Sequence, residues 1–167
     1  NKYVPILDGA QYLDDNLNRS ALLNFVMIDC YSEGYPDQQL EKLLAKLAQD
    51  KTAVICLSST NRNAMQSIRR MFVELMNKKI TNPAIIICDS NHKSTDESLI
   101  HYSIEAGGLL LDGFCDGVCL GHHFGNKNIP PKTKLLNSIA FGILQATRTR
   151  ISKTEYISCP SCGRTLF

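Results

Sequence analysis

Several features typical of membrane and secreted proteins are missing from this sequence. No apolar run approaches the roughly 20 residues that are needed to span a bilayer. Residues 1–5 do not lead into the apolar core of a signal peptide. The formal net charge of +2 gives no strong bulk attraction to nucleic acid or to a membrane surface. With 167 residues, 44% hydrophobic and 20% charged, the chain is predicted to be a soluble globular domain with neither kind of partner.

The cysteine content argues against a disulfide-stabilised scaffold. The chain has seven cysteines, an odd number, and no secretory signal accompanies them. Cys30, Cys56 and Cys88 lie in or at the end of apolar runs, where reduced cysteines are usually small core residues. We therefore expect a reducing compartment, either a cytosol or an organelle stroma.

Apolar runs and amphipathic stretches alternate along the chain at intervals of roughly 25–30 residues, a pattern typical of βαβ units. Strands are predicted at residues 25–30, 53–57, 84–88 and 109–112, a further short apolar run lies at residues 118–120, and helices are predicted at residues 38–49, 62–78, 95–106 and 133–147. The pattern predicts an α/β fold with four to five mostly parallel strands. We expect a small open sheet or a partial TIM-like barrel, because so few strands cannot close an eight-stranded barrel. An irregular C-terminal tail follows.

Two local signals predict where the third of these helices begins and ends. Ser94 and Glu97 have the spacing of a capping box, in which each side chain accepts a hydrogen bond from the other residue's backbone amide. Gly107 and Gly108 are predicted to stop the helix before the strand at residues 109–112. Residues 1–22 show no clear period, so they predict only a lead-in segment with room for one short helix.

Polar side chains follow the predicted strands. They are Asp29 and residues 58–61, 89–91 and 112–116. Ligands of parallel α/β sheets bind beyond the carboxyl ends of the strands, so these residues are candidates for a site there. The alternative is that the Ser, Asn and Asp side chains cap the following helices, and that residues 112–116 form a simple turn.

The C-terminal tail carries two further candidates. Arg148, Arg150 and Lys153 form a basic strip in which alternate arginines can present forked donors to phosphate oxygens, although a helix dipole also favours arginines after a helix. Cys159 and Cys162 form a Cys-Pro-Ser-Cys-Gly knuckle whose spacing lets two thiolates hold one metal ion. No second Cys-x2-Cys pair is present. Spacing alone leaves structural zinc and an iron–sulfur cluster equally open.

The residues around the knuckle carry a family likeness. Residues 153–167, KTEYISCPSCGRTLF, closely resemble part of the 4-hydroxy-3-methylbut-2-enyl diphosphate synthases, iron–sulfur enzymes of the non-mevalonate isoprenoid pathway. The likeness extends to GLLLDGFCDGV at residues 108–118 and to NSIAFGILQATRTR at residues 137–150. Residues 1–105 more weakly resemble the insertion of the longer, three-domain members. Ile151 departs from the pattern, because a small polar residue is expected there.

The resemblance implies a reductase that opens the ring of 2-C-methyl-D-erythritol 2,4-cyclodiphosphate with two electrons from ferredoxin or flavodoxin. It implies a 4Fe-4S cluster held by three cysteines and one glutamate, and Cys159 and Cys162 match the first two cysteines. The basic run lies near the substrate diphosphate in such enzymes, which makes Arg148, Arg150 and Lys153 candidates for substrate binding. The compartment would be the bacterial cytoplasm or a plant plastid stroma, and a homodimer is an open expectation.

The sequence also predicts that the chain is a fragment, because it lacks an initiator Met and ends five residues after Cys162. We expect an α/β, barrel-like insertion domain at residues 1–147. A linker and the truncated start of the cluster domain then occupy residues 148–167. With two of four ligands, the fragment is expected to be inactive and to lack the cluster. The competing hypothesis is an α/β binding module with half a zinc ribbon as its tail.

Overall fold

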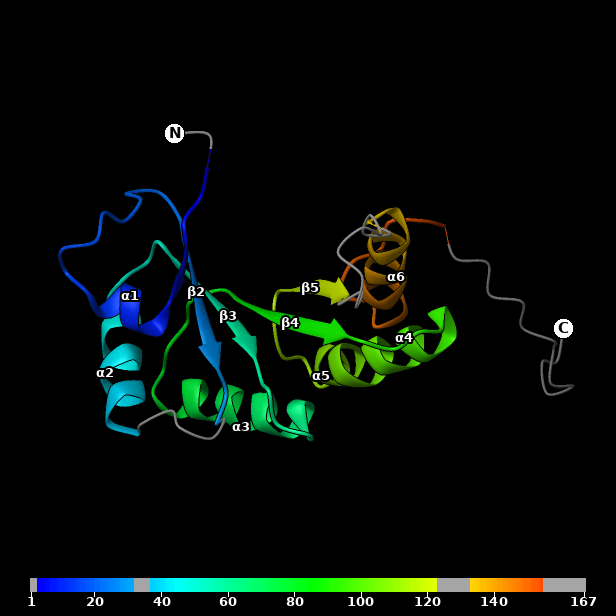
Figure 1. Cartoon of the computed structure of the whole chain (residues 1–167), viewed down its shortest axis with the longest axis horizontal. Coiled ribbons are helices and arrows are strands. Elements are labelled where there is room, and N and C mark those ends of the chain that lie inside the picture. The colour runs from blue at the N-terminus through cyan, green and yellow to red at the C-terminus, as the bar shows by residue number, and fades with distance from the viewer. Residues whose placement is uncertain (1–2, 32–36, 123–132, 155–167) are drawn as a thin grey trace, which may run out of the picture.

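Five parallel strands lie side by side in the order in which they occur along the chain (Figure 1). The computed structural model describes residues 3–31, 37–122 and 133–154. The strands are β1 (Ile6–Asp8), β2 (Asn24–Asp29), β3 (Ala53–Ser58), β4 (Ala84–Ser90) and β5 (Gly117–His122). The helices are α1 (Gly9–Leu13), α2 (Asp37–Leu47), α3 (Ala64–Asn77), α4 (Thr95–Tyr102), the π-helical turn η1 (Ser103–Gly107), α5 (Gly108–Leu111) and α6 (Thr133–Ala146). The predicted α/β class is confirmed, and the sheet is open and entirely parallel.

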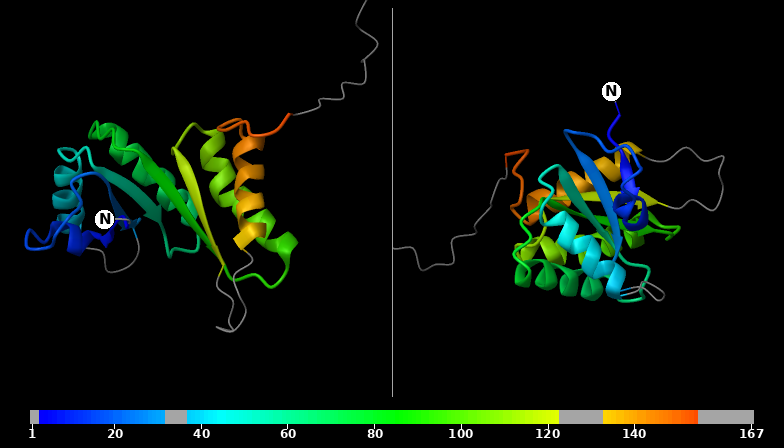
Figure 2. Two further views of the ribbon diagram at one scale, coloured as in Figure 1. Left: turned by 90° about the horizontal axis from the view of Figure 1, so that it is seen from above. Right: turned by 90° about the vertical axis from the view of Figure 1, so that its left-hand side faces the viewer.

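One face of the sheet forms the core together with the helices. Side chains on this face, such as Val26, Ile55 and Ile86, are at most 1% exposed. They share one hydrophobic cluster with the predicted apolar stripe of α2 and with the inner side of α3. The helices lie beside the sheet in the same order as the strands: α2, then α3, then the segment from α4 to α5, and then α6 (Figures 1 and 2). Within the described ranges, no helix has the length and apolar character needed to cross a membrane.

The other face of the sheet is only partly covered. Phe25, Met27, Val54 and Ile85 alternate with the core residues and are partly buried, and Ile6 is 67% exposed. The difference in burial between the two faces of the sheet follows from the strand order. A doubly wound sheet reverses its order and thereby gains helices on both faces. A sheet that keeps its order, with right-handed crossovers, keeps its helices on one face, as in an arc of a barrel.

The strand predicted at residues 109–112 is wrong, because the preceding helix does not stop at Gly107 and Gly108. Helix α4 continues through η1 into α5, which contains three leucines of the predicted strand. The last strand is instead β5, which includes the short apolar run at residues 118–120. A run of three leucines cannot be assigned from periodicity, because both a buried strand and a buried helix contain such runs.

Gly108 permits close packing of this helical segment. A Cβ atom on Gly108 would lie 3.1 Å from Met65 Sδ in α3, which is tighter than ordinary contact. A Cβ atom on Gly107 would lie 3.7 Å from Ile143 Cγ2 in α6, which is an ordinary van der Waals contact. Gly108 therefore lets the segment approach α3, and this role has no local sequence signature that distinguishes it from a helix stop.

The helix ends instead at Gly113, which has a φ of 80°. The Gly113 amide donates to the Leu110 carbonyl at 3.1 Å, and the Phe114 amide donates to the Leu109 carbonyl at 3.0 Å. This pair of bonds is a Schellman motif, which satisfies the last carbonyls of the helix and favours glycine at the left-handed position.

The N-terminal segment contains the one short helix that its sequence allowed, α1, and a strand that was not predicted, β1. A capping box begins α1: the Gln11 amide donates to Asp8 Oδ1 at 2.7 Å, and the Asp8 amide donates to Gln11 Oε1 at 3.0 Å. The box predicted at Ser94 and Glu97 differs from the structure, because Ser94 Oγ accepts from the Asp96 amide at 3.2 Å. A three-residue strand such as β1 is too short to show a period.

We expect opposite effects from alanine at two glycines. Gly113→Ala should lower the free energy of unfolding by about 1 kcal/mol, because alanine is strained at positive φ. Gly142→Ala, in the interior of α6 with no atom within 4 Å of the new Cβ, should raise it by about 0.5–1 kcal/mol. Urea unfolding of both variants measures the difference. Equal effects of the same sign would contradict the assignment of the helix end to Gly113.

The buried hydroxyl of Tyr12 connects α1 to the turn before β3. The Tyr12 side chain is 0% exposed, and its hydroxyl donates to Asp50 Oδ2 at 2.6 Å. Asp50 Oδ1 also accepts from the amide of Thr52 at 2.8 Å and from its hydroxyl at 2.6 Å. Burial acts to raise the pKa of the Asp50 carboxyl, but these hydrogen bonds outweigh burial and hold that pKa below its usual value.

Tyr12→Phe should lower the free energy of unfolding at pH 7 by about 1.5–3 kcal/mol, because a hydrogen bond to a charged acceptor is lost. The pKa of Asp50 is lowered on folding, so the stabilisation is present above the usual pKa of aspartate. It is lost as the pH falls through the lowered pKa. The difference between the two proteins in urea unfolding should therefore shrink below about pH 4.

Tyr3→Phe is the matched control, because Tyr3 is 90% exposed, and its effect should stay within about 0.5 kcal/mol. A Tyr12→Phe difference that is the same at pH 7 and at pH 3 would contradict the role given to the ionised Asp50.

Candidate functional site

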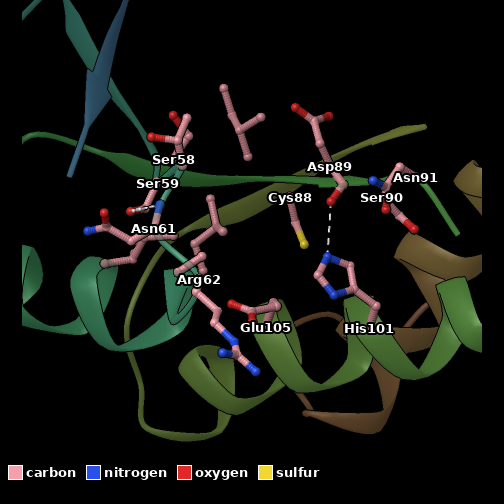
Figure 3. A pocket seen from close by; sticks show the side chains of 15 residues that line it. Ser58, Ser59, Asn61, Arg62, Cys88, Asp89, Ser90, Asn91, His101 and Glu105 are labelled. Atoms are coloured by element: carbon pink, nitrogen blue, oxygen red, sulfur yellow. Dashed lines mark hydrogen bonds between the residues drawn. The ribbon is translucent and has the colours of Figure 1, made fainter. Parts of the chain in front are cut away.

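The carboxyl ends of β3 and β4 border a pocket with a volume of about 760 Å³ (Figure 3). The loop between β3 and α3 forms one wall, and the end of β4 with residues 89–91 forms another. His101 from α4 and Glu105 from η1 line it from the helix side. Two of the candidate segments, residues 58–61 and 89–91, therefore line one pocket at the carboxyl ends of the strands.

Hydrogen bonds fix the loop between β3 and α3 against the end of β2. Asp29 Oδ1 accepts from the Thr60 amide at 3.1 Å, and Asp29 Oδ2 accepts from the Thr60 hydroxyl at 3.3 Å. Asn61 Nδ2 donates to the Tyr31 carbonyl and to Ser67 Oγ, both at 2.9 Å. Asp29 therefore organises the next loop of the sheet, and Asn61 reaches the first turns of α3 from a position three residues before its first residue.

The wall formed by β4 combines a buried thiol with a fixed imidazole. His101 Nε2 lies 3.0 Å from the Asp89 carbonyl, which can only accept, so the ring presents its Nε2–H there (Figure 3). Burial, and then the nearby Glu105 and Asp89 carboxylates, raise the pKa of the Cys88 thiol to about 12. Cys88 is therefore a neutral part of the wall at physiological pH and not a thiolate nucleophile.

Gly121 makes room for Asp89 between β4 and β5. The two residues are register partners in the parallel ladder. A Cβ atom on Gly121 would lie 1.9 Å from Asp89 Oδ1, which no real Cβ could occupy without displacing the carboxylate. The carboxylate thus lies directly over the Gly121 backbone.

Residues 112–116 do not join this site, so that part of the prediction is wrong. Asp112 lies at the end of α5 and pairs with Arg69 of α3. Asp116 Oδ2 accepts from the Ala84 amide at 2.8 Å, which places Asp116 at the beginning of β4. The prediction failed because it assumed a strand at residues 109–112. They belong to a helix, so the residues that follow lie at the amino end of the sheet.

Three charged or titratable lining residues were not predicted: Arg62, His101 and Glu105. Arg62 directly follows the predicted polar loop, so its position in the chain was the available signal. His101 and Glu105 lie within a predicted helix, and only the continuation of that helix through η1 orients Glu105. Cys30, Cys56 and Cys88 are buried free thiols, as predicted.

The basic strip after α6 lies on the surface. Arg148, with a φ of 58°, Arg150 and Lys153 are all exposed. The Arg150 guanidinium carbon lies 5.3 Å from the ring centre of Phe141. Phe141 lines two hollows beside α6, one of about 400 Å³ that Arg150 also lines and one of about 700 Å³ that Lys153 also lines. The role of all three side chains in diphosphate binding stays a prediction.

Gln145 holds the start of the tail against α6. Its Oε1 accepts from the Ser152 amide at 3.3 Å, from the Ser152 hydroxyl at 3.2 Å and from the Lys153 amide at 3.0 Å. Its Nε2 donates to the Lys153 carbonyl at 3.0 Å. One side chain in the last turns of the helix therefore sets the path of the two tail residues.

Gln145→Ala should speed hydrogen exchange at the Ser152 and Lys153 amides by about tenfold, because both lose their acceptor. Amide exchange followed by NMR measures the effect. Gln145→Glu is the matched control: it keeps the acceptor oxygens, so protection of the two amides should persist. Equal exchange rates in Gln145→Ala and the unsubstituted chain would show that Gln145 does not hold the tail.

Metal binding has no candidate within the described residues. No group of three or more His, Cys, Asp or Glu side chains is arranged there to hold a metal ion. Cys159 and Cys162 lie outside the described residues, so their role as ligands stays a prediction.

Similar proteins share one name, 4-hydroxy-3-methylbut-2-en-1-yl diphosphate synthase (flavodoxin). The protein of Parabacteroides distasonis is 42% identical over 127 residues, covering 76% of this chain and 20% of the relative. The protein of Chlorobaculum tepidum is 33% identical over 160 residues, covering 95% of this chain and 20% of the relative. The chain is homologous to a segment of these synthases. No protein-family model and no solved structure matches it.

The homology to these synthases extends along almost all of the chain. The protein of Porphyromonas gingivalis is 33% identical over 160 residues, which cover 96% of this chain and 25% of the relative. The chain therefore spans about a fifth to a quarter of the length of the relatives that it matches. The resemblance predicted from the sequence is confirmed as homology, and the assignment to an insertion domain stays a prediction.

Proposed function

We propose that this chain is part of a flavodoxin-dependent 4-hydroxy-3-methylbut-2-en-1-yl diphosphate synthase, which converts 2-C-methyl-D-erythritol 2,4-cyclodiphosphate to 4-hydroxy-3-methylbut-2-enyl diphosphate. The observation that carries the proposal is the alignment of 160 residues, 95% of the chain, with a relative of that name. The reaction comes from the resemblance, the flavodoxin partner from the name of the relatives, and a compartment that holds reduced thiols from the cysteine content.

In this proposal the α/β body, residues 1–147, is the insertion domain, and residues 148–167 begin the cluster domain. The body is suited to a rigid mechanical role, because its core continues through all four crossovers of the sheet. Its partly exposed face is apolar at Phe25, Met27 and Ile85, which supports a barrel-like arrangement in which further strands or another domain cover it.

The substrate-binding part of the proposal rests on the basic strip. Arg150 and Lys153 border neighbouring hollows on α6, and Gln145 holds the backbone that carries Lys153. Arg148 and Arg150 provide forked donors and Lys153 a point charge, a set suited to diphosphate oxygens. Their function would be to bind and orient the diphosphate, so their removal should act on substrate affinity more than on turnover.

Cys159 and Cys162 fit the cluster in their chemistry, because pairs of thiolates are the usual ligands of iron–sulfur clusters. When bound, a 4Fe-4S cluster supplies electrons for the reductive ring opening. The chain has these two thiolates in a Cys-x2-Cys pair and no second such pair. We therefore expect the 167-residue chain by itself to be inactive and to bind at most adventitious zinc.

The test uses the full-length synthase that contains this segment, with the cyclodiphosphate and reduced flavodoxin as substrates. Cys159→Ser and Cys162→Ser should each lower turnover by roughly 100-fold and reduce the absorbance of the cluster, because a thiolate ligand is lost. Arg150→Gln should raise KM roughly tenfold with a smaller effect on kcat, since a charge-assisted hydrogen bond is lost.

Ser161→Ala and Lys93→Gln are the matched controls within the knuckle and on the exposed surface, and both should stay within about twofold. Full activity with either cysteine replaced would overturn the ligand assignment. A stoichiometric 4Fe-4S spectrum from the 167-residue chain alone would overturn its expected inability to hold a cluster. One zinc per two chains, bound tightly, would instead support the zinc-ribbon hypothesis.

A further inference from the structure

A buried carboxylate oxygen in the pocket beyond β3 and β4 lacks a partner. Glu105 Oε2 is buried, and no described residue donates a hydrogen bond to it. Leaving a buried acceptor unpaired is unfavourable, typically by more than a formed hydrogen bond contributes. Glu105 lies in the π-helical turn η1, a distortion that often occurs at functional sites. Its carboxylate points from the helix toward the strands (Figure 3).

A cation lines the same pocket without neutralising this carboxylate. Arg62 follows the loop after β3 and is one of the lining residues. No ion pair within 4.0 Å joins Arg62 to any carboxylate in the described part of the chain. The pocket therefore offers a forked donor and a separate acceptor, although direct pairing of the two would satisfy both.

The remaining lining is a short apolar floor with polar edges, together with His101 and with Asp89, whose carboxylate points away from His101 and Glu105 (Figure 3). Ile68 and Ile86 contribute buried aliphatic groups, while Ser58 and Asn91 contribute polar side chains near the strand ends. A volume of about 760 Å³ accommodates a ligand with a small carbon skeleton together with water. This combination of one cationic donor, one acceptor and an apolar floor is typical of sites for small organic molecules.

We propose that this pocket binds a small hydroxylated organic anion, with its anionic group at Arg62 and a hydroxyl group donating to Glu105 Oε2. Arg62 supplies the charge-assisted hydrogen bonds. Because the protein shields Oε2, the partly exposed Glu105 side chain has to turn its carboxylate toward the pocket, where the hydroxyl then supplies the missing partner. The site is distinct from the basic strip after α6 and does not depend on the proposed function.

NMR titration of the isotopically labelled 167-residue chain tests the site. The probes are sn-glycerol 3-phosphate and D-glycerate, which carry both groups, and inorganic phosphate and glycerol, which carry one each. At least one of sn-glycerol 3-phosphate and D-glycerate should bind about tenfold more tightly than inorganic phosphate or glycerol. Its binding should shift the amide signals of Arg62 and Glu105. The affinities of sn-glycerol 3-phosphate and D-glycerate, compared with each other, distinguish a phosphate ligand from a carboxylate ligand.

Two variants remove the proposed contacts separately. Arg62→Gln alters an exposed side chain, should fold normally, and should weaken the preferred probe about tenfold. Glu105→Leu should remove the preference for hydroxylated anions and raise the melting temperature, because the unpaired acceptor is gone. The controls are Lys42→Gln and Glu97→Gln, which alter exposed charges on α2 and α4 and should leave binding unchanged.

Several results would overturn the proposal. Equal affinity for inorganic phosphate and sn-glycerol 3-phosphate, unchanged in Glu105→Leu, would reduce the site to unspecific anion binding. Shifts confined to Arg148, Arg150 and Lys153 would place the ligand on the tail instead. The absence of any shift at Arg62 and Glu105 with all four probes would exclude this ligand class.

Discussion

The fold depends on one constraint: each strand is joined to its immediate neighbour by a crossover on the same face. This arrangement places every helix against one side of the sheet, where residues such as Ile55 and Ile86 are almost fully buried. It also leaves the opposite side without equivalent cover, so that apolar side chains such as Phe25 remain partly accessible. The order further aligns all carboxyl ends at one edge, where the loop after β3 and the end of β4 meet around the pocket.

The helical segment from α4 to α5 lines that pocket with His101 and Glu105. Gly108 lets this segment approach α3, and η1 lies immediately before α5. The extra residue in the π-helical turn changes the direction of the side chains that follow it. Glu105 thereby points toward the strands, while His101, one turn earlier, reaches the Asp89 carbonyl.

Much of the architecture could be predicted from local patterns, because continuous apolar runs and amphipathic stripes report directly on burial. The strands β2, β3 and β4 and the long helices are of this kind. The structure of residues 107–112 could not be predicted in this way, since Gly-Gly followed by three leucines is compatible with both a helix stop and tight helix packing. The prediction that Asp112 and Asp116 lie beyond the carboxyl end of a strand was wrong for the same reason. Arg62 could have been found from its position directly after the polar loop 58–61, whereas Glu105 joins the pocket through a tertiary arrangement that no spacing along the chain reveals.

The pairing of Asp89 with Gly121 restricts how this part of the molecule can change. The carboxylate occupies the volume that any side chain at position 121 would need, because a Cβ there would lie 1.9 Å from Asp89 Oδ1. A side chain at position 121 would therefore have to turn the Asp89 carboxylate aside, and the exposed Asp89 side chain has room to rotate. Among related proteins, a larger residue at the equivalent of position 121 should accompany a shorter or reoriented side chain at the equivalent of position 89.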